Sequence, residues 1–113
     1  SEVMNIIGEV KNKTCILLDD IADSAGTLCN AAESLKENGA NEIYSYIAHG
    51  VLSGSALQRI TDSEIRELVL TDSIQATDEV KNTKNIRHIS IAPLMGEAIK
   101  RINSDSSVSA LFD

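Results

Sequence analysis

The sequence predicts an α/β fold in which helices pack on a parallel sheet, and three observations lead to this prediction. A continuous apolar run at residues 14–18 is typical of a strand that is buried on both faces of a sheet. A helical pattern follows at residues 26–37, and a β-rich run at residues 42–48 completes a βαβ unit, whose two strands are parallel. A chain of 113 residues forms at most one domain.

The first half of the chain gives a separate signal for each element. Residues 1–10 are expected to form a strand-like lead-in, and residues 11–13 a polar turn. The helix at residues 26–37 has one apolar stripe with i, i+3, i+4, i+7 spacing, made of Leu28, Ala31, Ala32 and Leu35. Asn38 and Gly39 end this helix, because glycine readily takes the left-handed conformation that stops a helix.

The second half of the chain repeats the alternation of helices and strands. Residues 49–55 are a predicted loop with two glycines, residues 56–60 a short helix, and residues 67–71 a third parallel strand. Residues 75–85 are typical of a solvated loop with a helical turn, and residues 85–92 alternate as an outer strand does.

A last helix and a short tail complete the predicted elements. Pro93 suits the first turn of a helix that runs to about Asn103. The apolar side chains expected to face inward from this helix are Leu94, Ala98, Ile99 and Ile102. In the tail, Phe112 is the only phenylalanine of the chain, and we expect it to dock into a protein surface.

The composition excludes several classes of partner. With 17 acidic and 10 basic residues the net charge is −7, which argues against nucleic acid and against an anionic membrane surface. Cys15 and Cys29 are expected to be buried thiols, because two cysteines without metal spacing indicate neither a disulfide framework nor zinc. No apolar run approaches the ~20 residues of a membrane-spanning helix. No signal-peptide pattern is present, so we expect a cytoplasmic location.

The candidate site lies where the first strand passes through a short loop into a helix. The free amides and the positive dipole end at a helix N-terminus bind anions. Ser24, Gly26 and Thr27 suit a phosphate, because glycine admits close approach and hydroxyls donate hydrogen bonds. Asp19 and Asp20 would repel phosphate; they suit sugar hydroxyls or a divalent cation, or else they only cap the helix or end the strand. The combination predicts a site for a sugar phosphate.

The stretch from Leu18 to Thr27, Leu-Asp-Asp-Ile-Ala-Asp-Ser-Ala-Gly-Thr, resembles the phosphoribosyl-binding motif of the type I phosphoribosyltransferase fold. Later motifs narrow the resemblance to the ribose-phosphate diphosphokinase (PRPP synthetase) family, and they lie at residues 49–54, 70–74, 96–99 and 107–112. The terminal Ser-Val-Ser-x-Leu-Phe is the most specific of them. The resemblance implies a three-layer phosphoribosyltransferase-like fold. Residues 1–113 would be a partial domain that corresponds to the last, C-terminal third of the enzyme.

The resemblance also implies roles for the residues of the loop at 19–27. Asp19 and Asp20 would meet the ribose 2- and 3-hydroxyls and lie close enough to touch a bound Mg²⁺. The residues that would hold the 5-phosphate are Asp23, Ser24, Ala25, Gly26 and Thr27. The family often has Thr at the position of Ser24 and Gly at that of Ala25, and we expect the loop to survive both changes. Asp23 is an anion beside an anion site, and we expect it to cap the helix.

The resembled reaction transfers the diphosphoryl group of ATP to the 1-hydroxyl of ribose 5-phosphate and gives PRPP and AMP. In the family the adenine loops, a His and an Asp for the metal, and a mobile Lys/Arg loop all precede this region. We therefore assign the chain no catalytic residue and no metal ligand, and expect it to be inactive alone, with one sheet face exposed. The implied partners are ATP, PRPP and a phosphate or ADP effector, in a homo-oligomer that is a hexamer in the family. In the tail at 104–113, Ser107 and Ser109 would contribute to the effector site.

Two other functions remain open on the sequence. One is a non-catalytic phosphate-binding or regulatory subunit that tunes a full synthetase through its tail. The other is a phosphoribosyltransferase that uses PRPP with a nitrogenous base, which the lack of a base-stacking aromatic residue after the loop disfavours. His49 has no visible Ser or Cys partner, so we expect a structural or interface role for it and a structural or exposed position for His88. Residues 71–73 lie at a predicted strand end, where ligands of open α/β sheets gather.

Overall fold

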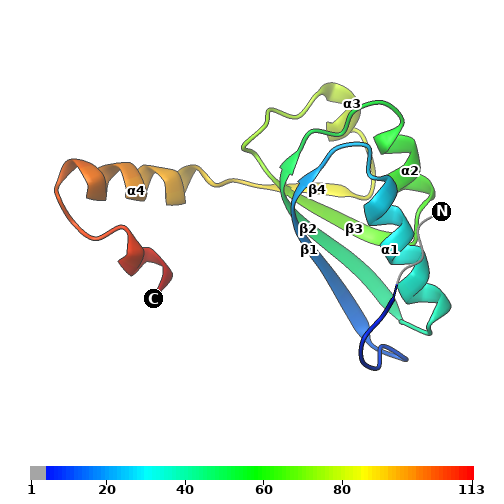
Figure 1. Cartoon of the computed structure of the whole chain (residues 1–113). Helices are drawn as coiled ribbons and strands as arrows, with labels where there is room; N and C mark the ends of the chain where they lie inside the picture. Colours follow the sequence, from blue (N-terminus) through cyan, green and yellow to red (C-terminus); the bar gives the residue numbers. More distant parts are fainter. Residues whose placement is uncertain (1–4) are drawn as a thin grey trace.

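The computed structural model describes residues 5–113, in which strands and helices alternate along the chain (Figure 1). The strands are β1 (Thr14–Ala22), β2 (Glu42–Gly50), β3 (Ile65–Thr71) and β4 (Ile86–Ile89). The helices are α1 (Gly26–Glu37), α2 (Ala56–Asp62), α3 (Asp78–Lys81), α4 (Ala92–Asn103) and the 3-10 helix η1 (Ser109–Phe112). From β1 to α4 the predicted order of strands and helices is confirmed, and α1 has its predicted bounds.

The strands form one parallel sheet in the order β1-β2-β3-β4. Cys15 of β1 pairs with Ile43 of β2, and Leu68 of β3 pairs with Ile86 of β4. The predicted parallel α/β fold and the outer position of β4 are therefore confirmed. The expectation that the run at residues 14–18 is buried on both faces of the sheet is wrong within the described residues, where β1 is an edge strand and Leu18 is 77% exposed.

Helices α1 and α2 cover one face of the sheet (Figure 1). In β2 and β3, alternate side chains such as Ile43, Ile47 and Leu68 point to this face and are buried there, because successive residues of a strand face opposite ways. Ala32 of α1 and Ala56 of α2 are fully buried, and their small side chains let the helices approach the strands closely. The core consists of Ala22, Ala25, Ala32, Ala40, Ile43, Ile47, Ala56, Ile60, Ile65, Leu68, Leu70, Val80 and Ile86.

The other face of the sheet carries apolar side chains without a helical layer in the described part of the chain. Leu18 of β1 is 77% exposed, and Ile16, Tyr46 and Ile89 on the same face are also exposed. Among the strand residues of the described chain, only Val69, in the inner strand β3, is buried on this face. The residues described thus supply two layers of a three-layer α/β fold, and the expected uncovered face is present.

Two segments differ from the sequence-based expectations, and one predicted boundary is confirmed. Residues 5–10 form no strand, so the expected lead-in is wrong there, and its first four residues lie outside the described part. His49 and Gly50 belong to β2 instead of the following loop, because they pair with Ile21 and Ala22 of β1. The end of α1 is as predicted, with Gly39 at a φ of +93° directly after the helix.

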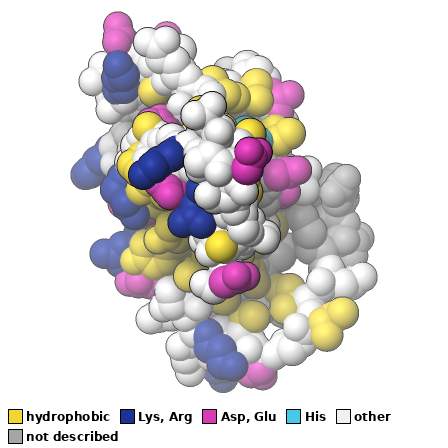
Figure 2. Space-filling model, turned by 90° about the vertical axis from the view of Figure 1, so that its left-hand side faces the viewer, with side chains coloured by type: hydrophobic (Ala, Val, Ile, Leu, Met, Phe, Trp, Pro, Cys, Tyr) yellow, Lys and Arg dark blue, Asp and Glu magenta, His cyan; other side chains and the backbone are white. Residues whose placement is uncertain are grey.

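Helix α4 projects away from the sheet, and the tail turns back beside it (Figure 1). None of its side chains is buried, and Ile99 and Ile102 are 62% and 66% exposed. The expectation that its apolar stripe faces inward is wrong for the described residues, because no element of the chain lies against that stripe. Figure 2 views the molecule from this side and shows apolar side chains open to solvent among charged ones. Phe112 is 72% exposed as well, so it docks on no surface formed by residues 5–113.

Candidate functional site

The carboxyl ends of β1, β2 and β3 meet at one edge of the sheet, because the three strands are parallel. The loop that leaves β1 therefore lies beside the loop that leaves β2. Backbone hydrogen bonds join the two loops, since the amides of Val51 and Leu52 both donate to the carbonyl of Ala22, at 3.0 and 3.1 Å. The amide of Ser53 continues this ladder to the carbonyl of Asp23, at 3.0 Å.

The loop at residues 23–25 ends on a left-handed residue. Ala25 is the N-cap of α1 and has a φ of +65°, a conformation that glycine adopts more easily than alanine. The expected loop thus forms with Ala in this position, and its methyl group is buried in the core. No hydrogen bond within residues 5–113 engages the amides of residues 24–28, and no side chain caps the helix. These amides are free to donate to an anion.

Asp23 does not cap α1, and this expectation is wrong. One of its carboxylate oxygens instead accepts a hydrogen bond from the hydroxyl of Ser53, in the loop after β2. The side chain is turned toward the neighbouring loop, because the backbone pairing of Ser53 with Asp23 brings the two residues together. The negative charge of Asp23 therefore has a partner outside the helix end.

A cavity of about 410 Å³ opens beside this loop. Six of the seven predicted substrate-binding residues line it, namely Asp19, Asp23, Ser24, Ala25, Gly26 and Thr27. Asp20, the next residue of β1, is not among the residues that line it. The amide of Asp20 donates to a carboxylate oxygen of Asp19 at 2.8 Å, and both side chains are exposed.

The space over Gly26 is open. A Cβ placed on this residue would meet only the hydroxyl of Ser24, at 3.8 Å, which is an ordinary contact. Its φ is not positive, so the fold itself does not require glycine here. The missing side chain leaves room for a ligand atom to approach the backbone at the start of α1.

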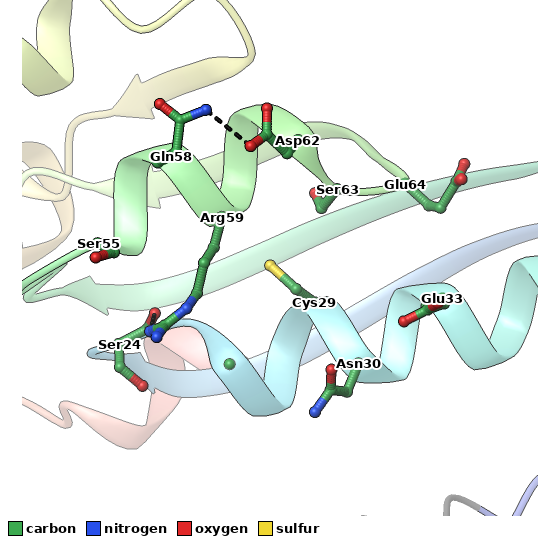
Figure 3. Close-up of a pocket in the computed structure, with 11 residues that line it drawn as sticks. Ser24, Cys29, Asn30, Glu33, Ser55, Gln58, Arg59, Asp62, Ser63 and Glu64 are labelled. Atoms are coloured by element: carbon green, nitrogen blue, oxygen red, sulfur yellow. Dashed lines mark hydrogen bonds between the residues drawn. The ribbon is translucent and has the colours of Figure 1, made fainter. Parts of the chain in front are cut away.

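A second cavity, of about 650 Å³, lies between α1 and α2 (Figure 3). Arg59 of α2 reaches across it, and its Nη1 donates to the carbonyl oxygen of Ser24 at 2.9 Å. Cys29 of α1 points its sulfur toward α2 in the same cavity. Burial raises the pKa of the Cys29 thiol above its ordinary value, although a hydrogen bond with Ser63 and the charge of Arg59 act in the other direction. Both cysteines are free and partly buried.

Sequence reasoning missed a pair of polar residues at the same edge of the sheet. His49 Nδ1 and Ser73 Oγ are 2.7 Å apart, so the expectation that His49 lacks a serine partner is wrong. The hydroxyl of Ser73 also lies 3.2 Å from the carbonyl oxygen of Ala48, and that of Thr71 donates to the same oxygen at 2.6 Å. The two partners lie 24 residues apart, and only the pairing of β2 with β3 brings them together.

The residues predicted to bind an effector lie at the far end of the chain from this loop (Figure 1). The hydroxyls of Ser107 and Ser109 are 3.0 Å apart, and the guanidinium of Arg101 donates to the carbonyl of Ser107 at 3.0 Å. The tail is thus folded against the last turn of α4. The sheet edge and the tail remain two separate places in the described structure.

Comparison with known proteins decides the family. The family model for the phosphoribosyl synthetase-associated domain matches residues 2–113. The chain belongs to this family. Curated relatives named ribose-phosphate pyrophosphokinase are 61% identical in Caulobacter vibrioides and 62% identical in Mesorhizobium japonicum, over all 113 residues. The chain spans 36% of the length of these relatives. The crystal structure of phosphoribosylpyrophosphate synthetase from Mycobacterium smegmatis matches with a TM-score of 0.83 and 37% identity, over 88% of this chain and 33% of the other.

Carboxylate oxygens, of the kind that bind Mg²⁺, are present side by side in the sequence at Asp19 and Asp20. Mg²⁺ is commonly bound by one or two carboxylates together with water and substrate phosphates, and Asp19 and Asp20 offer two adjacent exposed carboxylates. Residues 5–113 contain no group of three or more His, Cys, Asp or Glu side chains that could hold a metal by themselves. No helix in the same residues is long and apolar enough to cross a membrane.

Proposed function

We propose that this chain carries the ribose 5-phosphate site of a ribose-phosphate diphosphokinase, the enzyme that makes PRPP and AMP from ATP and ribose 5-phosphate. The observation that carries the proposal is one cavity lined both by Asp19 and by residues 24–27, whose amides have no hydrogen-bond partner in the described chain. Amide donors suit the dianionic phosphate, and a carboxylate suits sugar hydroxyls, so the two ends of one sugar phosphate would find complementary partners.

In this proposal the residues of the chain bind and orient the acceptor substrate. The amides and hydroxyls of residues 24–27 hold the 5-phosphate, and Asp19 and Asp20 accept from the ribose 2- and 3-hydroxyls. The sugar is then fixed with its 1-hydroxyl turned toward the donor, and such positioning supplies much of the catalysis in phosphoryl transfer. Mg²⁺, when bound beside the two carboxylates, would neutralise charge on the phosphates.

The rest of the reaction is assigned to a part of the enzyme outside this sequence. We propose that the chain is the C-terminal part of the longer protein, which the terminal Ser-Val-Ser-x-Leu-Phe motif supports, and that alone it makes no PRPP. Formation of PRPP from ATP, Mg²⁺ and ribose 5-phosphate by the purified 113-residue chain would contradict this. Intact mass spectrometry of the protein from its native source tests the larger size. A cytoplasmic location, which the free cysteines support, belongs to the same proposal.

The sugar-phosphate site is tested by calorimetry with ribose 5-phosphate. Gly26→Ala is the sharpest variant, because its methyl group fits the protein but fills the space proposed for the phosphate. We expect its dissociation constant to rise about tenfold or more, the equivalent of one lost hydrogen bond to a charged group. Gly96→Ala, on exposed α4, is the matched control and should bind as the unchanged chain does. Equal affinity in both variants would overturn the assignment.

A separate variant tests the sugar end of the site. Asp19→Asn should weaken ribose 5-phosphate and leave the affinity for inorganic phosphate unchanged, because the carboxylate is assigned to the hydroxyls. Asp105→Asn, beyond the end of α4, controls for the loss of one negative charge. A loss of phosphate affinity equal to that for the sugar phosphate would refute this division of roles.

A regulatory, phosphate-binding subunit is the second candidate, and the separate fold of the tail favours it. Ser107 and Ser109 place two hydroxyls together in the tail, at a distance from the sheet edge. An ADP or phosphate effector is proposed to bind at these two hydroxyls. Calorimetry with ADP and sulfate decides between the candidates. Effector binding without ribose 5-phosphate binding would support the regulatory subunit. The exposed apolar side chains of the sheet face and of α4 support a homo-oligomer, and a compact monomer in light scattering would count against it.

A further inference from the structure

Arg59 is set apart from the other arginines in the described chain by what it contacts. Arg66, Arg87 and Arg101 each pair with a glutamate, at Glu42, Glu67 and Glu97. Arg59 has no ion pair within residues 5–113, and its guanidinium instead donates to a backbone carbonyl, that of Ser24, at 2.9 Å. Figure 3 shows the side chain extended from α2 toward this residue. The positive charge of Arg59 therefore acts on the loop of the candidate site.

The contact fixes the direction of one peptide unit. A peptide bond is planar and trans, so the carbonyl oxygen of Ser24 and the amide hydrogen of Ala25 point to opposite sides. Ser24 lines both cavities, with α2 on one side and the proposed phosphate site on the other. Holding the oxygen on the α2 side directs the Ala25 amide away from Arg59, toward the side of the phosphate site. That amide has no partner in the described chain.

The loop needs such a constraint. Ala25 has a φ of +65°, a left-handed conformation that is strained for alanine, so the surrounding contacts must hold it. The segment that follows β2 supplies these contacts twice, through Ser53 to Asp23 and through Arg59 to Ser24. A charged donor on the carbonyl also polarises the peptide and strengthens its N–H as a donor.

We propose that Arg59 is a positioning residue that holds the Ser24–Ala25 peptide so that the Ala25 amide is aimed at the substrate phosphate before binding. The inference rests on the proposed ribose 5-phosphate site. Arg59 itself does not touch the substrate; it acts through the loop. Lysine would replace it poorly, because a point charge lacks the planar fork that sets the direction of the guanidinium hydrogen bond.

The kinetic test uses the complete protein that carries this sequence. Arg59→Met should raise the KM for ribose 5-phosphate about tenfold, the value of one charge-assisted hydrogen bond, and change kcat less than about twofold. The KM of Arg59→Lys should fall between that of the unchanged protein and that of Arg59→Met. The lysine variant serves as the second variant if the methionine variant does not fold. Added methylguanidinium should restore part of the lost affinity to Arg59→Met. Arg66→Met, which removes an exposed arginine at the amino end of β3, away from the carboxyl edge that carries the site, should leave both constants unchanged.

An NMR measurement separates this inference from the proposed function. In the ligand-free protein, the Ala25 amide resonance should shift, and its hydrogen exchange should accelerate, in Arg59→Met but not in Arg66→Met. Unchanged Ala25 signals in both Arg59 variants would overturn the positioning role, whatever the protein binds. An unaltered KM with shifted Ala25 signals would overturn the link to the substrate phosphate. Failure of the unchanged protein to bind ribose 5-phosphate would refute the proposed function, while the Ala25 signals would still report on the loop.

Discussion

The loops at the carboxyl edge of the sheet and helix α4 are both exposed, but they are held in different ways. Residues 23–25 are tied to the segment after β2 by a backbone ladder, by the hydroxyl of Ser53 and by the guanidinium of Arg59. Helix α4 buries none of its side chains. The segment that leads into it is held to the end of β3 by the hydrogen bond from the amide of Ile91 to the carboxylate of Asp72. An exposed loop can thus be held in one conformation by tertiary contacts, whereas a regular helix can owe its conformation to its local sequence alone.

The largest expected difference between the two regions is in the effect of removing a leucine side chain. Leu68 of β3 is fully buried under the helices, so Leu68→Ala should lower the free energy of unfolding by about 2–5 kcal/mol. Leu94 of α4 is 44% exposed, so Leu94→Ala should change it by less than about 0.5 kcal/mol. Urea unfolding of the 113-residue chain measures both values. A similar large loss in Leu94→Ala would show that α4 packs against a second copy.

Glycine-to-alanine substitutions should have opposite signs in the two regions. A Cβ at Gly50, where β2 ends, would lie 2.6 Å from Cδ1 of the buried Leu70, so Gly50→Ala should destabilise by about 1–3 kcal/mol. A Cβ at Gly96 in α4 would meet nothing within 4 Å, and Gly96→Ala should stabilise the helix by about 0.5–1 kcal/mol. Thermal unfolding of each variant tests the pair. Two changes of the same sign would mean that the regions do not differ in packing.

A smaller effect is expected for the thiol between α1 and α2. Burial raises the pKa of Cys29, so alkylation of a Cys15→Ser variant by iodoacetamide should reach half its maximal rate at a higher pH than in the urea-unfolded chain. Arg59→Met should move the midpoint higher still, because the guanidinium charge lowers this pKa. The raised pKa contributes stability below the unfolded-state pKa, and this contribution is lost as pH rises through the folded-state value. Equal midpoints in folded and unfolded chains would contradict the burial.

The smallest effect concerns the connection between the sheet and α4. Asp72 accepts a hydrogen bond from the amide of Ile91 at 2.9 Å, and this bond, followed by one with Ser90, lowers the pKa of its carboxyl group. The Ile91 amide should therefore stay protected from hydrogen exchange at neutral pH and lose protection as pH falls through the lowered pKa. In Asp72→Asn the acceptor remains but the pH dependence should vanish. If the pH dependence of the protection persists in this variant, a titratable group other than Asp72 causes it.

The sequence alone determined the features that depend on near neighbours. The stripe from Leu28 to Leu35, the glycine stop at Gly39 and the strand-to-helix turn at residues 23–26 are all readable over a few residues, and each lies where it was predicted. The local pattern also indicated the family correctly. The prediction for α4 shows the limit of such patterns, because an apolar stripe predicts a helix but not whether anything covers it.

Only the tertiary structure decided which residues act together at the candidate site. The partners Arg59 and Ser24 lie 35 residues apart, and Ser53 and Asp23 lie 30 apart, so no local pattern could pair them. The register of β1 with β2 sets these contacts, because it fixes which positions of the two outgoing loops face each other. The same register turned Asp23 away from the helix it was expected to cap. Local propensity specifies the elements, whereas the alignment of parallel strands specifies the site.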